Sequence, residues 1–196
     1  MDLSVAVPAV ILLSPVMAGA SVAVLVSLGR PILFRQTRVG FAEREFRIYK
    51  FRTMRPGNPD ASPDEDHLRI TRLGALLRST SIDELPQLFN VLKGEMSLVG
   101  PRPLLTRYLP RYSPRQRRRQ EVMPGLTGWA QIHGRNSVGW DEKLEHDVWY
   151  VEHWSPWLDV SIVLRTALKV LQASDVSAEG HATMPEFMGV AQHTSG

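Results

Sequence analysis

Two adjacent carboxylates, Asp83 and Glu84, precede a helical pattern and are the residues of this sequence best suited to chemistry. A carboxylate with a pKa of about 3.9 is already a nucleophile at neutral pH, as in aspartyl-phosphate enzymes. Neighbouring residues on a helix do not face each other, so the two acids can take different tasks. The second acid could hold Mg2+, which proteins usually bind through one or two carboxylates together with substrate phosphates.

A helix cap is the structural alternative for these acids. Ser81 and Glu84 fit the S-x-x-E capping box, in which an acid near a helix start has no chemical role. With Ser81 as N-cap, however, Pro86 would be the fifth helical residue and would damage the helix, whereas with Asp83 as N-cap it is the third, where no N–H is needed. We therefore predict Asp83 as the N-cap, where the helix N-terminus favours an ionised acid and attracts phosphate.

A stiff loop follows the same segment. The Gly-Pro-Arg-Pro sequence at 100–103 fixes Arg102 between two prolines. Of the 23 basic residues in the chain, 19 are arginine. Planar guanidinium groups suit phosphate recognition on nucleic acids, lipid headgroups or nucleotides, so composition alone leaves these three open.

An apolar N-terminal stretch indicates that the chain contacts a membrane. The 26 residues from Leu3 to Leu28 carry no charge and would form about 39 Å of helix, which exceeds a hydrocarbon core of about 30 Å. A cleaved signal peptide is disfavoured because Asp2 stands where a basic residue is usual. Hydropathy leaves a straight transmembrane helix open. A re-entrant helix is the other possibility, because Pro15 frees the carbonyl of Ile11, Ser14 could satisfy it, and a bend there would let the segment enter and leave by the same face.

The remaining sequence predicts one domain of α+β class, mostly helical, since 196 residues can bury a core and no cysteine supplies a disulfide. Alternation over 34–54 predicts a short β-hairpin with Lys50 and Arg52 on one face. Helical patterns cover 68–78, 140–154 and 157–171, and the first and last suit interfacial amphipathic helices. The expected fold thus places a re-entrant helix, a hairpin and interfacial helices around a small active-site core.

Four arginines follow a helix start at Ser113-Pro114, namely Arg115, Arg117, Arg118 and Arg119. Such a cluster can bind nucleic acid or anionic lipid. No nucleic-acid-binding fold accompanies it, so we predict no nucleic-acid partner. A non-catalytic membrane adaptor, which binds anionic lipids through basic amphipathic helices, remains the alternative to an enzyme.

From Phe34 to about Gly189 the chain resembles the bacterial sugar transferase family, in particular the small monotopic polyprenyl-phosphate phosphoglycosyl transferases of the bacillosamine and N-acetylamino-sugar type. Seven segments carry this resemblance in order: Arg-Gln-Thr-Arg-Val-Gly at 35–40, Tyr-Lys-Phe-Arg-Thr-Met at 49–54, Thr-Arg-Leu-Gly at 71–74, Asp-Glu-Leu-Pro-Gln at 83–87, Leu-Val-Gly-Pro-Arg-Pro at 98–103, Pro-Gly-Leu-Thr-Gly-Trp-Ala-Gln at 124–131 and Asp-Val-Trp-Tyr-Val at 147–151.

The resemblance implies three regions. Residues 1–30 would form a re-entrant membrane helix bent at Ser14 and Pro15, residues 31–189 a cytoplasmic catalytic domain, and residues 190–196 a tail. Together with Arg30, Arg35 and Arg38 and the positive-inside rule, this indicates a bacterial plasma-membrane enzyme with its active site on the cytoplasmic face. A phospholipid membrane is then a partner, and a homo-oligomer is left open.

The resemblance also implies a reaction, the transfer of a sugar phosphate from a UDP-sugar to undecaprenyl phosphate with release of UMP. Asp83 would carry the phosphosugar covalently, and Glu84 would hold Mg2+. The donor expected from the segment 180–189 is an N-acetylated amino sugar, and the product would start a bacterial glycoconjugate such as an exopolysaccharide, O-antigen, capsule or glycoprotein. The expected phosphate-binding residues are Arg78, Arg102, Lys50 and Arg52.

Overall fold

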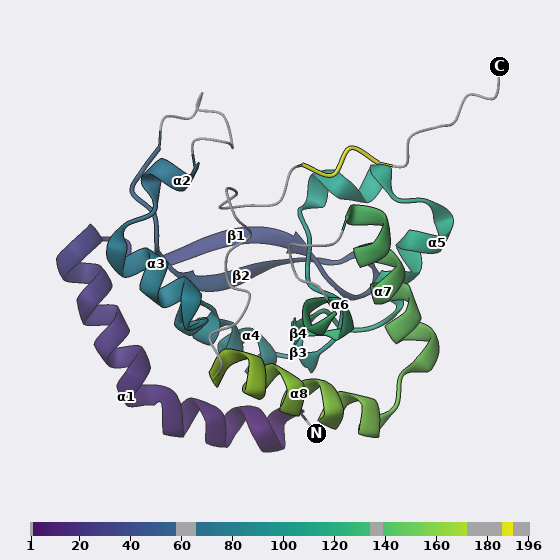
Figure 1. Ribbon diagram of the computed structural model, residues 1–196, viewed down its shortest axis with the longest axis horizontal. Coiled ribbons are helices and arrows are strands. Elements are labelled where there is room, and N and C mark those ends of the chain that lie inside the picture. The colour runs from purple at the N-terminus through teal and green to yellow at the C-terminus, as the bar shows by residue number, and fades with distance from the viewer. Residues whose placement is uncertain (1, 58–65, 134–138, 172–185, 190–196) are drawn as a thin grey trace.

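The computed structural model describes residues 2–57, 66–133, 139–171 and 186–189. Its class is α+β and mostly helical, as predicted. Figure 1 shows a long helix, α1, curving around one side of the molecule, with the hairpin at the centre, α7 on the opposite side, and α8 along the lower edge beside the first half of α1. Of the segment 180–189, to which the sequence resemblance extends, only residues 186–189 are among those described.

The first half of the chain contains α1 (Asp2–Leu28), β1 (Leu33–Val39), η1 (Phe41–Glu43), β2 (Glu45–Phe51), α2 (Asp66–Arg69), α3 (Arg72–Ser79), η3 (Ile82–Gln87) and α4 (Leu88–Leu92), where η marks a 3-10 helix. The second half contains β3 (Ser97–Val99), η4 (Thr106–Arg111), α5 (Pro114–Arg117), η5 (Arg118–Glu121), β4 (Gly125–Thr127), α6 (Trp129–Ile132), α7 (Trp140–His153) and α8 (Pro156–Leu171). The predicted helices over 140–154 and 157–171 are confirmed.

α1 is helical throughout, although it contains Pro8 and Pro15. The hydroxyl of Ser14 donates to the carbonyl of Ile11 at 2.8 Å, which is the carbonyl that Pro15 leaves without its helical N–H. The predicted compensation at this pair is therefore present. Figure 1 shows the helix turning between two straighter runs, in keeping with a proline inside a helix.

Both ends of α1 are fixed to the rest of the fold. At the first end, Asp2 Oδ1 accepts hydrogen bonds from Ser97 Oγ at 3.1 Å and from the Leu98 N–H at 3.2 Å. At the other end, the guanidinium of Arg52 donates to the three successive carbonyls of residues 28–30. Two distant points of the helix are thus attached to one compact body.

The β-hairpin is confirmed, with β1 and β2 antiparallel and Phe34 opposite Lys50. One buried cluster packs the hairpin residue Ile48 with Leu88 and Val91 of α4 and Ile162 of α8. A second cluster packs Phe51 with the second half of α1 and with α3. The hairpin is therefore the scaffold between α1 and η3, the segment that carries the two acids.

The single helix predicted over 68–78 is wrong, because the structure divides it into α2 and α3. Ile70 makes a β-bridge with Met54, and Thr71 caps α3 by accepting the Gly74 N–H on its side chain at 3.0 Å. A helix could continue through this point only by giving up both interactions. Gly74 itself lies so close to the segment after β2 that a Cβ there would be 2.0 Å from the carbonyl oxygen of Thr53.

A second, parallel pair of strands was not predicted. β3 and β4 pair Ser97 with Gly125 and Val99 with Thr127. Their backbones meet so closely beyond β3 that a Cβ on Gly125 would lie 2.1 Å from the Gly100 nitrogen. This close approach fixes the start of the Gly-Pro-Arg-Pro loop against β4.

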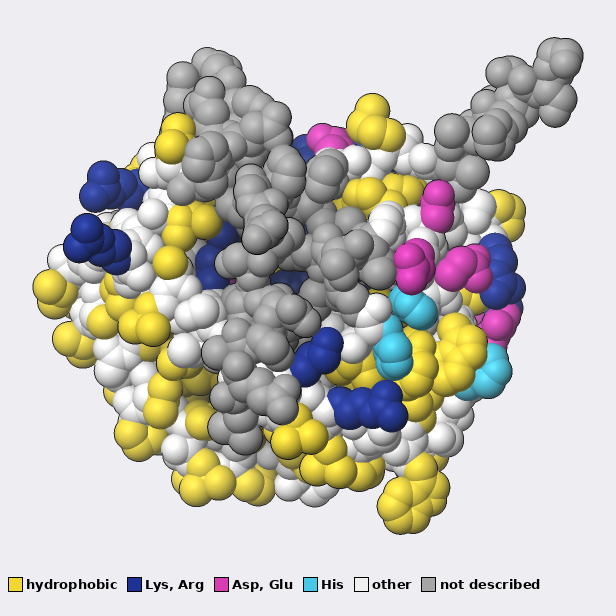
Figure 2. Space-filling model, viewed as in Figure 1, with side chains coloured by type: hydrophobic (Ala, Val, Ile, Leu, Met, Phe, Trp, Pro, Cys, Tyr) yellow, Lys and Arg dark blue, Asp and Glu magenta, His cyan; other side chains and the backbone are white. Residues whose placement is uncertain are grey.

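One side of the molecule is rich in exposed apolar side chains. On α8, Trp157, Val160, Leu164 and Leu168 follow one another at helical spacing and are all exposed, Trp157 by 82 %. α1 is long and apolar enough to cross a membrane, and many of its outward side chains are exposed as well. Figure 2 shows hydrophobic side chains along the lower edge, where α1 and α8 run in Figure 1.

Candidate active site

The two acids lie in η3, where the predicted N-cap at Asp83 is wrong. The 3-10 helix begins at Ile82 after Ser81, whose φ of 57° is left-handed and whose side chain makes no capping bond. The capping-box alternative is therefore absent as well. Pro86 is tolerated because the α-helical part starts only at Leu88, so the proline removes a single bond from a short 3-10 segment.

Glu84 accepts hydrogen bonds from two cations that come from different parts of the chain. Lys50 Nζ of β2 lies 2.5 Å from Glu84 Oε1, and Arg102 Nη2 of the Gly-Pro-Arg-Pro loop lies 2.6 Å from the same oxygen. The second carboxylate oxygen, Oε2, has a longer contact of 3.4 Å with Arg102 Nη1. Two predicted phosphate-binding residues are thus brought together, and Glu84 bridges them.

The environments of the two acids push their pKa values apart. Burial, together with the negative charge of Glu84, raises the pKa of Asp83 to about 6, against the opposing charges of Lys50, Arg78 and Arg102. Burial also acts against ionisation of Glu84, but Arg102 and Lys50 hold the pKa of Glu84 well below its usual range. Such a divergence is typical of carboxylates with different tasks. The expectation that a helix N-terminus would set the ionisation of Asp83 is wrong, because burial dominates.

The predicted site residues separate into two groups. Arg78, in the last turn of α3, lies near enough to Asp83 for its charge to favour the carboxylate, so it joins Lys50 and Arg102 in the positive surroundings of the dyad. Arg52 instead faces the C-terminal end of α1. It follows the last residue of β2, where the chain leaves the strand, and its guanidinium is engaged with main-chain carbonyls.

Glu84 fits a magnesium ion held by a single carboxylate. No group of three His, Cys, Asp or Glu side chains suited to a metal occurs in the part of the chain that the structure describes. Mg2+ commonly takes one or two carboxylates and completes its shell with water and substrate phosphates. Glu84 is ionised and 21 % exposed, and its Oε2 has the weaker of the protein contacts, so this oxygen suits that mode.

Two further cations close to Arg102 were not identified from the sequence as site residues. Burial, followed by the charge of Arg102, lowers the pKa of Lys143 to about 8, and the same two causes lower the pKa of Arg38 to about 10. A main-chain bond from the Val39 N–H to Leu104 O at 3.1 Å brings the end of β1 beside the loop. Arg38 lies within a predicted strand, but its approach to Arg102 is a tertiary contact that spacing does not encode.

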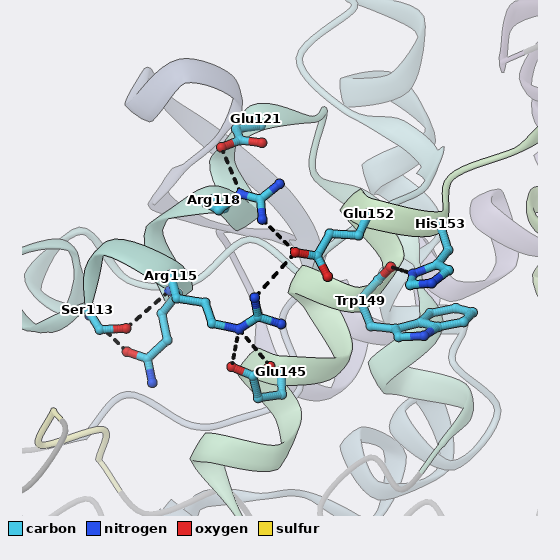
Figure 3. Close-up of polar contacts among 9 residues, drawn as sticks. Ser113, Arg115, Arg118, Glu121, Glu145, Trp149, Glu152 and His153 are labelled. Carbon is cyan, nitrogen blue, oxygen red and sulfur yellow. Dashed lines mark hydrogen bonds and ion pairs between the residues drawn. The ribbon is translucent and has the colours of Figure 1, made fainter.

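The run of arginines after Ser113 is engaged with carboxylates. Ser113 is the N-cap of α5, as predicted, and it forms a full capping box with Gln116. Figure 3 shows Arg115 between Glu145 and Glu152, and Arg118 between Glu121 and Glu152. The other two members of the run have acidic partners too, Glu43 for Arg117 and Asp147 for Arg119. The cluster is therefore not the free basic surface that the adaptor alternative needs.

An apolar groove of about 1000 Å³ lies between α1, the hairpin and η3. Its walls include Ser21 and Leu25 of α1, Phe34 of β1, and Pro86 and Phe89, which follow the two acids directly in the chain. Arg30, Arg35 and Arg52 also line it. An apolar groove with basic residues at its walls thus runs beside α1 and reaches Pro86, two residues after Glu84.

Comparison with known proteins gives a consistent result. The family described as "Bacterial sugar transferase" matches residues 1–173. The chain is 51 % identical over 169 residues to the uncharacterized sugar transferase EpsL of Bacillus subtilis, a match that covers 85 % of this chain and 83 % of that protein.

Two longer relatives have more specific names. The chain is 42 % identical over 180 residues to the UDP-N-acetylgalactosamine-undecaprenyl-phosphate N-acetylgalactosaminephosphotransferase of Aeromonas hydrophila. This match covers 87 % of this chain and 43 % of that protein. It is 40 % identical over 181 residues to the UDP-glucose:undecaprenyl-phosphate glucose-1-phosphate transferase of Escherichia coli. This match covers 86 % of this chain and 39 % of that protein. The chain thus spans less than half the length of these two relatives.

Proposed function

Because this chain belongs to the bacterial sugar transferase family, we propose that it moves a sugar phosphate from a UDP-sugar to undecaprenyl phosphate and releases UMP. The relatives named above carry this reaction in their names with different sugars. The observation that carries the proposal is the dyad, in which the buried Asp83 stands beside a partly exposed Glu84 that contacts two cations.

Asp83 is the nucleophile of the proposed mechanism. Its carboxylate oxygen attacks the sugar-linked phosphorus of the donor, an O–P bond forms, and the bond from that phosphorus to the UMP phosphate breaks. A phosphate oxygen of the lipid acceptor then attacks the same phosphorus, and the bond to Asp83 breaks. The carboxylate is restored and the product is a polyprenyl diphosphosugar, so two displacements complete the transfer without a net proton change on the protein.

The cations around Glu84 bind the phosphates that these steps require. Lys50 and Arg102 share the carboxylate of Glu84, and Arg78 adds positive charge near Asp83. When a diphosphate is bound, its oxygens compete with Glu84 for these donors, and the freed carboxylate of Glu84 would hold Mg2+. The metal would neutralise the diphosphate charge, which otherwise repels an anionic nucleophile.

The acceptor is supported by the position of the groove. Its apolar walls suit the isoprenoid part of the lipid, and they join residues of α1 to Pro86, which lies two residues after Glu84 in the chain. Because soluble donor and membrane lipid react in separate steps, one shallow site can serve both. The groove therefore gives a route for a buried lipid to a phosphate site at the membrane surface.

A re-entrant α1 is the topology that we propose, with the catalytic residues on the cytoplasmic face of a bacterial plasma membrane. Asp2 and residues 28–30 are both tied to the body that carries the dyad. A helix that crossed the bilayer would leave one of these ends about 30 Å away on the other face. The bond from Ser14 to Ile11 supports a bend at this point.

The donor that we propose is an N-acetylated amino sugar, which follows the resemblance of residues 180–189 and the N-acetylgalactosamine named for one relative. Other relatives are named for glucose or galactose, so the donor must be measured. The product would begin a bacterial glycoconjugate. Nothing in the arginine run favours the adaptor alternative.

The test is UMP release by detergent-solubilised protein with Mg2+, undecaprenyl phosphate and a panel of UDP-sugars. We expect UMP from an N-acetylated amino sugar donor. Asp83→Asn should abolish UMP release and the phosphosugar adduct that mass spectrometry detects on the wild-type protein. Substantial turnover by Asp83→Asn would refute the nucleophile, and neither UMP nor adduct across the panel would favour an adaptor.

Glu84→Gln tests the metal role separately. The uncharged amide should reduce the rate and change its dependence on Mg2+ concentration, while Asp83 stays in place. A Glu84→Gln variant whose Mg2+ response matched that of the wild type would remove Glu84 as the ligand.

A further inference from the structure

Arg119 and Asp147 form an ion pair in the interior of the protein, beneath the loop that carries Arg102. Their side chains are only 2 % and 3 % exposed. Asp147 Oδ2 accepts two hydrogen bonds from the guanidinium of Arg119, from Nη2 at 2.7 Å and from Nε at 3.0 Å. The chemistry proposed above uses neither residue, although Asp147 opens one of the segments that mark the family resemblance.

The pair reaches the active site through the main chain. Arg119 Nη2 also donates to the carbonyl oxygen of Arg102 at 2.6 Å, and the guanidinium of Arg102 in turn contacts Glu84 at 2.6 Å. Prolines on both sides of Arg102 restrict its backbone. A continuous series of short contacts thus runs from Asp147 through Arg119 and Arg102 to the dyad.

Stability alone is a weak reason for such a pair. Burying two charges costs desolvation energy, and apolar side chains of similar volume often serve as well or better. The pair does have a geometric effect, since it fixes η5, which carries Arg119, and α7, which carries Asp147, to the loop at Arg102. The hydroxyl of Tyr112 adds a contact of 3.4 Å with Arg119 Nη1. The guanidinium is therefore held from several directions while one of its N–H groups holds the loop.

We propose that Arg119 and Asp147 are positioning residues, which orient Arg102 for the donor diphosphate through the carbonyl of Arg102. The inference rests on the proposed function for the identity of the ligand. Neither residue touches substrate. Asp147 orients Arg119, and Arg119 sets the direction from which the Arg102 side chain leaves the loop.

A double-mutant cycle tests this in the half-reaction that forms the adduct, with Asp147→Asn, Arg102→Gln and the combined variant. In the wild-type background Asp147→Asn should raise KM for the donor about tenfold, within the range of coupling seen for residues in one network. In the Arg102→Gln background the same change should alter KM less than about twofold. Equal losses in both backgrounds would overturn the proposal and leave a structural ion pair.

A second readout needs no turnover, so it separates failure of this inference from failure of the proposed function. The Nε–H resonance of Arg102 in 15N-labelled protein is assigned by its loss in Arg102→Gln. We expect a single sharp signal in the wild type and a broadened or split one in Asp147→Asn. An unchanged signal would refute the positioning role even if no UDP-sugar proved to be a donor.

Two companion variants keep the test decisive. Arg119→Lys retains a cation for Asp147 but lacks the second arm that reaches the Arg102 carbonyl, so it should reproduce the KM increase and carries the test if Asp147→Asn does not fold. Glu145→Gln removes an exposed partner of Arg115 on the same helix as Asp147. It should leave KM and the Arg102 signal unchanged, and a similar KM increase in it would point to a general effect on α7.

Discussion

Glu84 and Glu152 each lie between two cations, yet their surroundings differ. Glu84 bridges Lys50 and Arg102 beside a second acid that burial has pushed toward neutrality. Glu152 bridges Arg115 and Arg118 on the surface, where Glu121 and Glu145 share the same arginines. The first cluster has its cations close to the buried carboxyl group of Asp83, the proposed nucleophile, whereas the charges of the second cluster neutralise one another at the solvent-exposed surface.

The difference shows which positive charge is available for a ligand. Exposed ion pairs are screened and exchange readily with water, so the surface network adds little beyond local order. At Glu84 the donors are partly buried, and a diphosphate that enters can take over ready-made hydrogen bonds. We therefore expect the longest basic run in the sequence to contribute less to ligand binding than the cations around Glu84.

The largest effect should follow removal of a cation from the Glu84 cluster. Arg102→Gln or Lys50→Gln should lower the rate of adduct formation about 100- to 1000-fold, comparable with the loss of one donor from a preorganised anion site. Rapid-quench measurement of UMP with excess donor would show this. A loss below about tenfold in both variants would mean that these side chains serve Glu84 rather than the substrate.

The second effect concerns pH, because the raised pKa of Asp83, about 6, places its titration in an accessible range. The nucleophile must be ionised, so at saturating Mg2+ adduct formation should be level above about pH 7 and fall about tenfold per unit below pH 6. Removing a positive charge disfavours the carboxylate, so Arg78→Gln should move this midpoint upward. A level profile down to pH 5 would indicate an Asp83 with an ordinary pKa.

A smaller effect is expected in the groove. Ser21→Phe narrows its wall, so KM for undecaprenyl phosphate should rise about tenfold, which corresponds to about 1.4 kcal/mol or roughly two buried methylene groups. Val22→Phe is the matched control, since Val22 is the next residue of α1 and is 61 % exposed. Adduct formation, which needs no lipid, should be unchanged in both. Equal KM values in the two variants would remove the groove from the acceptor site.

The sequence predicted individual helices and strands better than the tertiary contacts between them. Periodicity was sufficient for the hairpin, α7 and α8, because each is a local pattern of apolar and polar residues. The division of α2 from α3 depends on a bridge from Ile70 to Met54, and the β3–β4 pair depends on close packing at Gly125, so both are tertiary events. Likewise the types of Lys50 and Arg102 suggested phosphate binding, but only the fold brings them to one oxygen of Glu84.

The smallest effect on activity is expected from changes in the surface network around Glu152. Its size tests whether this network matters less for function than the Glu84 cluster. The combined change of Arg115→Gln and Arg118→Gln removes both cations from Glu152. Because these side chains are exposed and screened, Tm should fall by no more than about 2 °C and UMP release should stay within about twofold of the wild type. Binding to vesicles with anionic lipid should also be retained, since α1 and the exposed face of α8 provide the apolar contact. A large loss of vesicle binding with normal UMP release would instead give this network the lipid-binding role that its ion pairs argue against.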